Sequence, residues 1–171
     1  MIDRYARDEM KSVWSEDNKY NKWLAVELAV CEAWAQAGVI PQKDMVKLRS
    51  AHHNTHRMDE IFQRTRHDMT AFTRSITESL GDEGRWIHLG LTSSDVLDTA
   101  QSLQLIDAAD LLLTQIDDLR AALRSRAIEF KNTLMMGRTH GIHAEPITFG
   151  LKLALWWDEA VSYTHLTLPT N

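Results

Sequence analysis

The sequence contains very little cysteine, proline or glycine, with one, three and seven of these residues among 171. The single cysteine, Cys31, excludes a disulfide framework and a zinc site built from cysteines, and it fits a reducing compartment. Few prolines and glycines leave long stretches without a helix-breaking residue. This scarcity favours a mostly helical chain.

The sequence also lacks a basic excess and a long apolar run. It has 19 basic and 24 acidic side chains and a formal net charge of −5, which argues against bulk binding of nucleic acid. No apolar run approaches the roughly 20 residues that span a membrane. The charged N-terminus does not resemble a secretory signal. With 44% hydrophobic and 25% charged residues, we expect a soluble, cytoplasmic globular protein with neither a nucleic-acid nor a membrane partner.

Apolar residues recur at helical spacing through the first half of the chain. A short helix is expected after Pro41, another after Thr55, and a third that Asp68 can cap. Together with a longer amphipathic helix from about Lys19 to Ala37, these predict an N-terminal helical domain over residues 1–93. The main face of the longer helix consists of Tyr20, Trp23, Glu27, Val30 and Trp34.

The stretch from Ser94 to about Lys131 predicts one very long helix. It contains neither glycine nor proline, and its apolar residues follow one another in steps of three and four. At 1.5 Å per residue such a helix is about 55 Å long. Additional leucines off the main stripe require several neighbours, so a multi-helix bundle or an oligomer is expected. We place the start of this bundle domain at residues 94–160.

The remainder of the chain divides into a loop, a helix and an unusual tail. Leu134 to Pro146 is interpreted as a polar loop containing two histidines, and a further helix is expected to begin near Ile147. Residues 161–171 are rich in β-branched side chains, which suit helices poorly, so we interpret them as an atypical, non-native tail.

Three polar clusters interrupt the apolar helical segments and are candidates for catalytic or ligand-binding sites. Thr92 and Ser93 offer hydroxyls at a helix N-terminus, which favours a bound carboxylate or phosphate, although for this cluster taken alone an ordinary helix cap is the better explanation. His140 is suited to proton transfer near neutral pH, and its alternative is a loop histidine satisfied by the backbone. The clusters are Arg66-His67-Asp68, His88 to Asp95, and Gly137 to Pro146.

Two groups of histidines raise the question of a metal site. His52, His53 and His56 form one group, and His140 with His143 forms the other. Neither group has a convincing third and fourth ligand nearby, so no metal is expected.

The order and spacing of the clusters resemble the adenylosuccinate lyase family of the fumarase/aspartase superfamily. The resemblance extends from Met1 to Glu159 and rests on Arg4-Tyr5, on Arg66-His67-Asp68, and on the Gly90 to Val96 and Gly137 to Pro146 segments. Ile147 departs from the family, in which a threonine is more usual. The resemblance implies an all-α fold: a small N-terminal helical domain followed by the first long helices of a fumarase/aspartase-type bundle, here truncated.

The resemblance also implies a lyase that releases fumarate by β-elimination. Its substrates are adenylosuccinate, which gives AMP, and succinylaminoimidazole carboxamide ribotide in purine biosynthesis; it uses no cofactor and forms a homotetramer. His140 would be the general acid, and His67 would assist proton transfer. The substrate-binding residues implied are Arg4, Tyr5, Arg66, His67, Asp68, His88, Thr92, Ser93 and Thr139.

One element of the family is missing from this sequence. The resemblance implies a general base that is a serine, on a Gly- and Ser-rich loop that ends in Pro-x-Lys-x-Asn. No segment of this sequence matches that loop. The chain is therefore expected to be an N-terminal fragment that is inactive alone. Two alternatives stay open: another superfamily lyase, such as argininosuccinate lyase or aspartase, or a non-catalytic helical module whose apolar stripes bind a partner.

Overall fold

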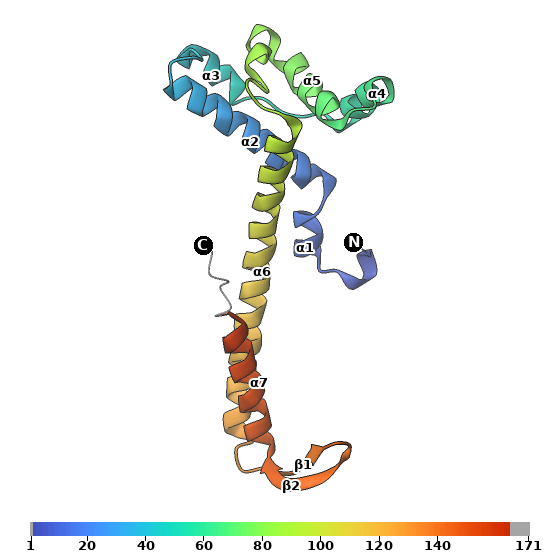
Figure 1. Ribbon diagram of the computed structural model, residues 1–171, viewed down its shortest axis with the longest axis vertical. Helices are drawn as coiled ribbons and strands as arrows, with labels where there is room; N and C mark the ends of the chain where they lie inside the picture. Colours follow the sequence, from blue (N-terminus) through green and yellow to red (C-terminus); the bar gives the residue numbers. More distant parts are fainter. Residues whose placement is uncertain (1, 165–171) are drawn as a thin grey trace. The chain divides into compact units, whose positions relative to one another are not determined.

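The computed structural model describes residues 2–164 and is predominantly helical (Figure 1). Contacts divide the chain into two compact units, which meet within the longest helix between Ala108 and Ala109. The described elements are η1 (Asp3–Tyr5), α1 (Asp8–Val13), α2 (Glu16–Gln36), α3 (Gln42–Leu48), α4 (Thr55–Thr65), α5 (Asp68–Leu80), η2 (Gly81–Trp86), α6 (Ser93–Glu129), β1 (Leu134–Thr139), β2 (Ile142–Thr148) and α7 (Phe149–Thr164), where η marks a 3-10 helix.

The predicted helical fold is confirmed, and the core of the first unit follows the predicted apolar faces. Phe72 of α5 is completely buried, and the rings of Tyr20 and Trp23 from α2 lie 6.2 and 5.2 Å from it. Val96 and Ala100, in the first turns of α6, are also fully buried. The start of α6 is therefore fixed within the first unit by packing, which matters because it carries candidate site residues.

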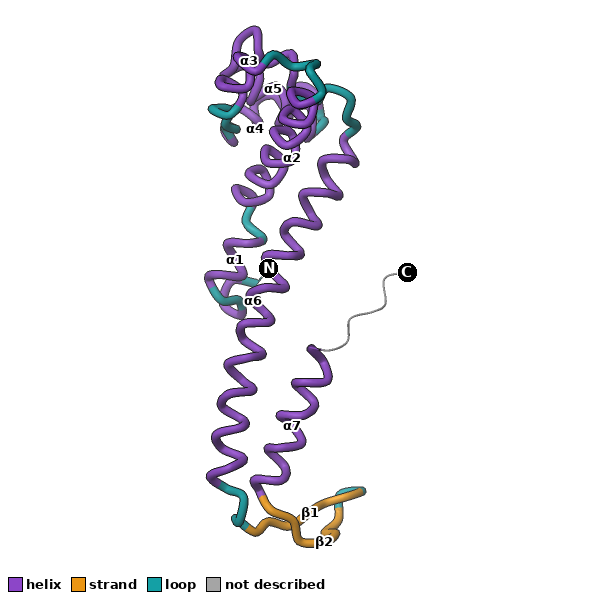
Figure 2. The backbone as a smooth tube through the Cα atoms, turned by 90° about the vertical axis from the view of Figure 1, so that its left-hand side faces the viewer, coloured by secondary structure: helices purple, strands orange, loops and turns teal. Residues whose placement is uncertain are grey.

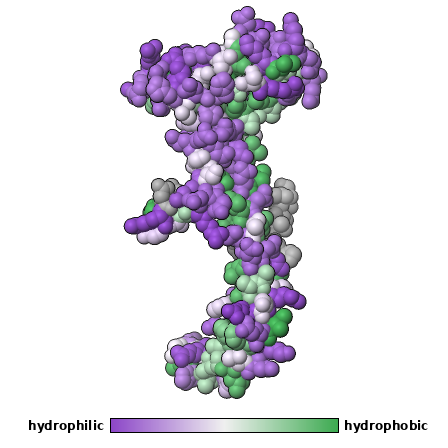
Figure 3. All heavy atoms as spheres, turned by 180° about the vertical axis from the view of Figure 1, so that it is seen from behind, coloured by the Kyte–Doolittle hydropathy of each residue, from purple (hydrophilic) through white to green (hydrophobic). Residues whose placement is uncertain are grey.

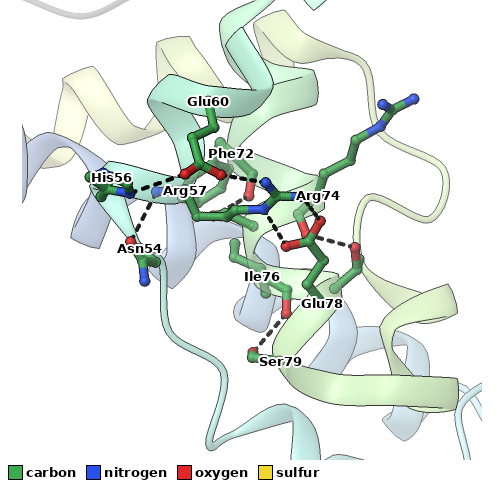
Figure 4. A network of polar contacts seen from close by, with 11 residues as sticks. Asn54, His56, Arg57, Glu60, Phe72, Arg74, Ile76, Glu78 and Ser79 are labelled. Atoms are coloured by element: carbon green, nitrogen blue, oxygen red, sulfur yellow. Dashed lines mark hydrogen bonds and ion pairs between the residues drawn. The ribbon is translucent and has the colours of Figure 1, made fainter. Parts of the chain in front are cut away.

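A polar network joins α4 to α5 (Figure 4). Arg57 donates from Nε and Nη2 to the two carboxylate oxygens of Glu78, at 2.7 and 2.8 Å, and from Nη1 to Glu60. These hydrogen bonds hold the pKa of both carboxyl groups below the usual glutamate range. Asn54 caps α4 by accepting from the Arg57 backbone N–H. The network clamps the two helices on either side of the Arg66–Asp68 turn.

The expected cap of α5 is wrong. His67 is the N-cap, and its ring Nδ1 accepts from the Thr70 backbone N–H at 3.2 Å, whereas Asp68 is the first helical residue. Asp68 instead accepts from the N–H of its neighbour Met69. The imidazole replaces the carboxylate because it reaches the third N–H of the helix from one position earlier.

The expected loop from Leu134 to Pro146 is also wrong, because β1 and β2 form an antiparallel hairpin there. A bulge lies between Met136 and Arg138, at Gly137, where a Cβ atom would come within 2.6 Å of the Glu145 carbonyl oxygen. The hairpin connects the end of α6 to α7, which turns back alongside α6 (Figures 1 and 2).

Helix α7 begins at Phe149, close to the expected start, and packs tightly on the end of α6 within the second unit. The Phe130 and Phe149 rings lie 5.3 Å apart. A Cβ atom on Gly150 would lie 2.4 Å from the Ala127 carbonyl oxygen, so only glycine permits this approach. α7 includes residues 161–164 of the predicted atypical tail, and residues 165–171 lie outside the described part of the chain.

Much apolar surface in the second unit is uncovered. Hydrophobic side chains reach its surface (Figure 3), and seven leucine, isoleucine or tryptophan side chains of α6 and α7 in this unit are at least 45% exposed. Patches of this kind on long helices mark assembly surfaces. No helix among residues 2–164 combines the length and hydrophobicity needed to cross a membrane.

Candidate active site

A buried carboxylate holds His88 between η2 and α6. Glu27 of α2 is 0% exposed, and its two oxygens accept from the His88 backbone N–H at 2.8 Å and from the ring Nδ1 at 2.6 Å. His88 has a φ of 66°, a left-handed conformation that is unfavourable for a residue with a side chain. Its imidazole is 25% exposed, so one edge of the ring is buried against Glu27 while part of it reaches solvent.

Further side chains of α2 hold the residues on either side of His88. Cys31 Sγ donates to the Trp86 carbonyl oxygen at 3.6 Å, and Trp34 Nε1 donates to the Leu89 carbonyl oxygen at 3.0 Å. Burial, together with the negative charges of Glu27 and Glu32, raises the pKa of the Cys31 thiol to about 11, so the thiol keeps its proton. One face of α2 therefore fixes the segment that leads into α6.

The segment ends at Thr92 and Ser93, where α6 begins. The Asp95 carboxylate accepts from the Thr92 backbone N–H at 2.8 Å, as the third helical residue does in a capping box. Among the described residues, neither the Thr92 nor the Ser93 hydroxyl has a hydrogen-bond partner. Two free hydroxyls at the positive end of a 37-residue helix can donate hydrogen bonds to a bound carboxylate. The Thr92 backbone N–H is not available to it, because that group already donates to Asp95.

The Arg66–Asp68 turn lies between α4 and α5 and is exposed. Arg66 ends α4 in the left-handed region, with φ at 53°. Because His67 Nδ1 accepts a backbone hydrogen bond, its neutral ring carries the proton on Nε2, which points a donor away from the helix. The turn thus presents a guanidinium and an imidazole N–H, both suited to an anionic or carbonyl-bearing ligand.

Arg4 and Tyr5 lie in η1 at the start of the first unit. The Arg4 guanidinium carbon lies 4.7 Å from the centre of the Tyr5 ring, and both side chains are exposed. The pair therefore offers a stacked cation and a phenol to solvent, a combination able to bind a phosphate group.

Thr139 and His140 lie in the second unit, at the tip of the hairpin. Thr139 pairs with Ile142, so His140 and Gly141 alone form the turn, with φ values of 53° and 78°. Positive φ at both central residues is the mark of a type I′ turn. His140 is exposed, which leaves both ring nitrogens accessible for proton transfer.

The three polar clusters share a backbone property. In the described chain, Arg66, His88 and His140 are the non-glycine residues with positive φ, and each belongs to a different cluster. Such conformations concentrate at functional sites. No hydrogen bond or ion pair among the described residues links one cluster to another, and the hairpin cluster belongs to a different unit from the other two.

Sequence reasoning missed Glu27 as a site residue. Glu27 lies within the apolar face of its helix, and a charged side chain in such a face needs a partner when it is buried. The presence of one carboxylate among apolar residues was the signal that could have identified it. The partner, His88, is 61 residues away along the chain.

Comparisons with known proteins identify the family of the chain. A family model described as lyase matches residues 3–165. The chain is 52% identical over 160 residues to adenylosuccinate lyase of Bacillus subtilis (strain 168), covering 93% of this chain and 37% of that protein.

Solved structures of similar fold include a fumarate lyase from Mesorhizobium sp. BNC1, with a TM-score of 0.85 and 28% identity over 92% of this chain and 38% of that one. Another is 3-carboxy-cis,cis-muconate lactonizing enzyme from Pseudomonas putida, with a TM-score of 0.85 and 26% identity over 93% of this chain and 38% of that one. The chain spans less than two fifths of the length of these relatives.

Proposed function

Since this chain belongs to the lyase family of the fumarase/aspartase superfamily, we propose that it forms part of the active site of an adenylosuccinate lyase. The reaction releases fumarate from adenylosuccinate, giving AMP, and from succinylaminoimidazole carboxamide ribotide. The observation that carries the proposal is the segment from His88 to Ser93. Side chains of α2 fix this segment, and it ends in two free hydroxyls at a helix N-terminus. That arrangement suits the succinyl carboxylate of such a substrate.

The reaction is an anti β-elimination. The groups that gain charge or exchange a proton during it determine which role each candidate residue has. A base removes the proton beside a carboxylate, the resulting aci-carboxylate gains negative charge, and the C–N bond breaks as the nitrogen receives a proton. Thr92 and Ser93 bind that carboxylate, so their hydroxyls and the helix N-terminus stabilise the charge as it develops. His140 is the general acid that protonates the nitrogen. The proton-abstracting base is not assigned to a residue of this chain.

The remaining candidates bind the nucleotide part of the substrate. Arg4 and Tyr5 hold the phosphate, and Arg66 with Asp68 completes the contacts on that side. His67 donates from Nε2, the nitrogen that its cap hydrogen bond leaves protonated, and so assists proton transfer. Thr139 positions the substrate beside His140. These arginines supply local positive charge to a chain whose net charge is −5.

Assembly into a homotetramer completes the site. The uncovered apolar side chains of α6 and α7 require partner helices, and the clusters are divided between two units of one chain. The active form is thus an oligomer located in the cytoplasm, where purine intermediates occur and a lone thiol stays reduced.

A chimera tests the proposal directly. We would replace the matching segment of the Bacillus subtilis enzyme with this sequence and follow fumarate release from adenylosuccinate. Substitution of His140 by Gln in the chimera should lower turnover by about 10²–10⁴-fold, while His143→Gln, on the same hairpin, should leave it nearly unchanged.

The outcomes separate the candidate functions. A chimera that assembles but turns over argininosuccinate or aspartate, and not adenylosuccinate, would reassign the substrate within the superfamily. Full turnover in the His140→Gln chimera would remove the general acid from the mechanism and refute the proposed role of the hairpin.

A further inference from the structure

On the basis of the proposed function, we propose that Glu27 is a positioning residue of the active site. Its buried carboxylate fixes His88 in one tautomer, so that the ring presents Nε2 to the substrate as a hydrogen-bond acceptor. Glu27 lies on α2, remote in sequence from every candidate cluster.

Burying the Glu27 carboxylate costs free energy, and a functional role would explain why this cost is tolerated. The side chain is 0% exposed, and its neighbours one turn away on α2, Trp23 and Cys31, are also buried. A buried carboxylate loses the solvation of its charge, and an apolar residue is often at least as stable in such a place. In the described chain both of its oxygens are used by one residue, His88, and neither contacts a lysine or an arginine.

The two hydrogen bonds determine where the proton of His88 lies. An ionised carboxylate only accepts, so both the His88 backbone N–H and the ring Nδ1 must donate. The neutral ring therefore carries its proton on Nδ1 and a lone pair on Nε2. The same contacts stabilise the left-handed backbone of His88, so one side chain sets both the direction and the tautomer of the ring.

His88 and His67 consequently offer opposite groups to a ligand. His67 Nδ1 accepts from the Thr70 N–H, so its Nε2 donates, whereas Nε2 of neutral His88 accepts. We assign His88 to an N–H or O–H donor of the nucleotide. The Glu27 carboxylate holds the proton on Nδ1, so Nε2 stays available to accept from that group.

Nitrogen-15 spectra of the histidine side chains of this chain test the tautomer without any assay of activity. The His88 signals are assigned by their loss in His88→Gln. At a pH where the ring is neutral, wild-type His88 should show a protonated Nδ1 and an unprotonated Nε2. The opposite tautomer in the wild-type chain would overturn the proposal even if no variant folds.

Glu27→Gln should invert the tautomer. The glutamine oxygen must accept the fixed backbone N–H, so its NH2 group faces Nδ1 and makes that nitrogen the acceptor. Glu27→Asp keeps a carboxylate and should retain the wild-type tautomer. Glu32→Gln is the matched control, because Glu32 lies on the same helix but binds Arg49 at the surface. A folded Glu27→Gln chain with an unchanged tautomer would contradict the proposal.

Turnover separates positioning from a structural role. In the chimera, Glu27→Gln should lower kcat at least about tenfold with a smaller change in KM, Glu27→Asp should recover part of the loss, and Glu32→Gln should stay within about twofold. A normal kcat for Glu27→Gln with an inverted tautomer would make Glu27 structural only. A confirmed tautomer in an inactive wild-type chimera would refute the proposed function and leave the orientation of His88 intact.

Discussion

Left-handed backbone at a residue with a side chain costs about 1–2 kcal/mol. At His88 the Glu27 carboxylate offsets this cost by accepting from both the backbone N–H and the ring. Arg66 and His140 lack such a compensating contact among the described residues. Both stand where glycine or asparagine would be more stable, at a helix end and in a tight turn. The side chains present there are best explained by ligand binding and chemistry.

Another partly buried histidine, His53, predicts pH-dependent stability. Its ring packs against Tyr20 and Phe72, Nε2 lies 3.1 Å from the Asn21 side-chain oxygen, and the buried Nδ1 has no hydrogen-bond partner in the described chain. Burial lowers the pKa of His53, the nearby Asp17 carboxylate opposes this in part, and His52 adds to the lowering.

The sign of the effect follows from this lowered pKa. The unfolded chain binds a proton at His53 near pH 6.5, whereas the folded chain resists it. The stability contributed by the neutral ring is therefore complete above pH 6.5 and is lost as the pH falls toward the folded pKa. Denaturant unfolding at several pH values should show a shallower acid loss in His53→Phe than in wild type. Parallel curves would contradict this expectation.

At the scale of elements, the sequence predicted helices well because their signal is repeated. In α6, apolar residues recur over many turns, so no single residue decides the assignment. The hairpin escaped prediction because its signal depends on two residues, and His140-Gly141 is not one of the usual turn pairs. The cap of α5 was assigned to Asp68 because histidine is an uncommon cap. Long-range pairing such as that of Glu27 with His88 leaves no local pattern at all.

The hairpin predicts a conflict between stability and activity. Asparagine adopts the left-handed region more readily than histidine, so His140→Asn should stabilise the second unit by about 0.5–1 kcal/mol. The same change removes the proposed general acid and should abolish turnover in the chimera. Thermal unfolding measures the first effect and fumarate release the second. A destabilised His140→Asn variant would show that the imidazole contributes to the turn itself.

Helix α5 depends on Phe72 for its attachment to α2. The ring is 0% exposed and contacts both Tyr20 and Trp23, so Phe72→Ala should cost about 3–5 kcal/mol. Phe62→Ala on α4, where the ring is 37% exposed, is the matched control and should cost clearly less. Urea unfolding measures both values. Equal costs would place the centre of the first unit's core elsewhere.

At the scale of the whole molecule, the position of the domain boundary remains a prediction. The sequence places it at residue 93, where the continuous helix α6 (Ser93–Glu129) begins, whereas the first turns of α6 pack into the core of the first unit. The resemblance of the ordered clusters identified the candidate site residues. The sequence does not predict whether these residues converge in space, because contacts between distant segments or between chains leave no periodic pattern within one chain.

The exposed apolar face of α6 predicts that this chain associates with itself. Leu112 and Leu119 are each more than half exposed, and burying such leucines between helices stabilises an assembly by about 1.5–3 kcal/mol each.

Sedimentation velocity over a range of concentrations should show oligomers or aggregates for the wild-type chain. The double variant Leu112→Gln with Leu119→Gln should shift the distribution toward monomer while keeping its helical circular dichroism. Val46→Gln, at an exposed apolar position on α3, should change neither. A wild-type chain that sediments as a clean monomer and melts cooperatively would show that these leucines need no partner, and the case for a site completed by neighbouring subunits would lose its physical basis.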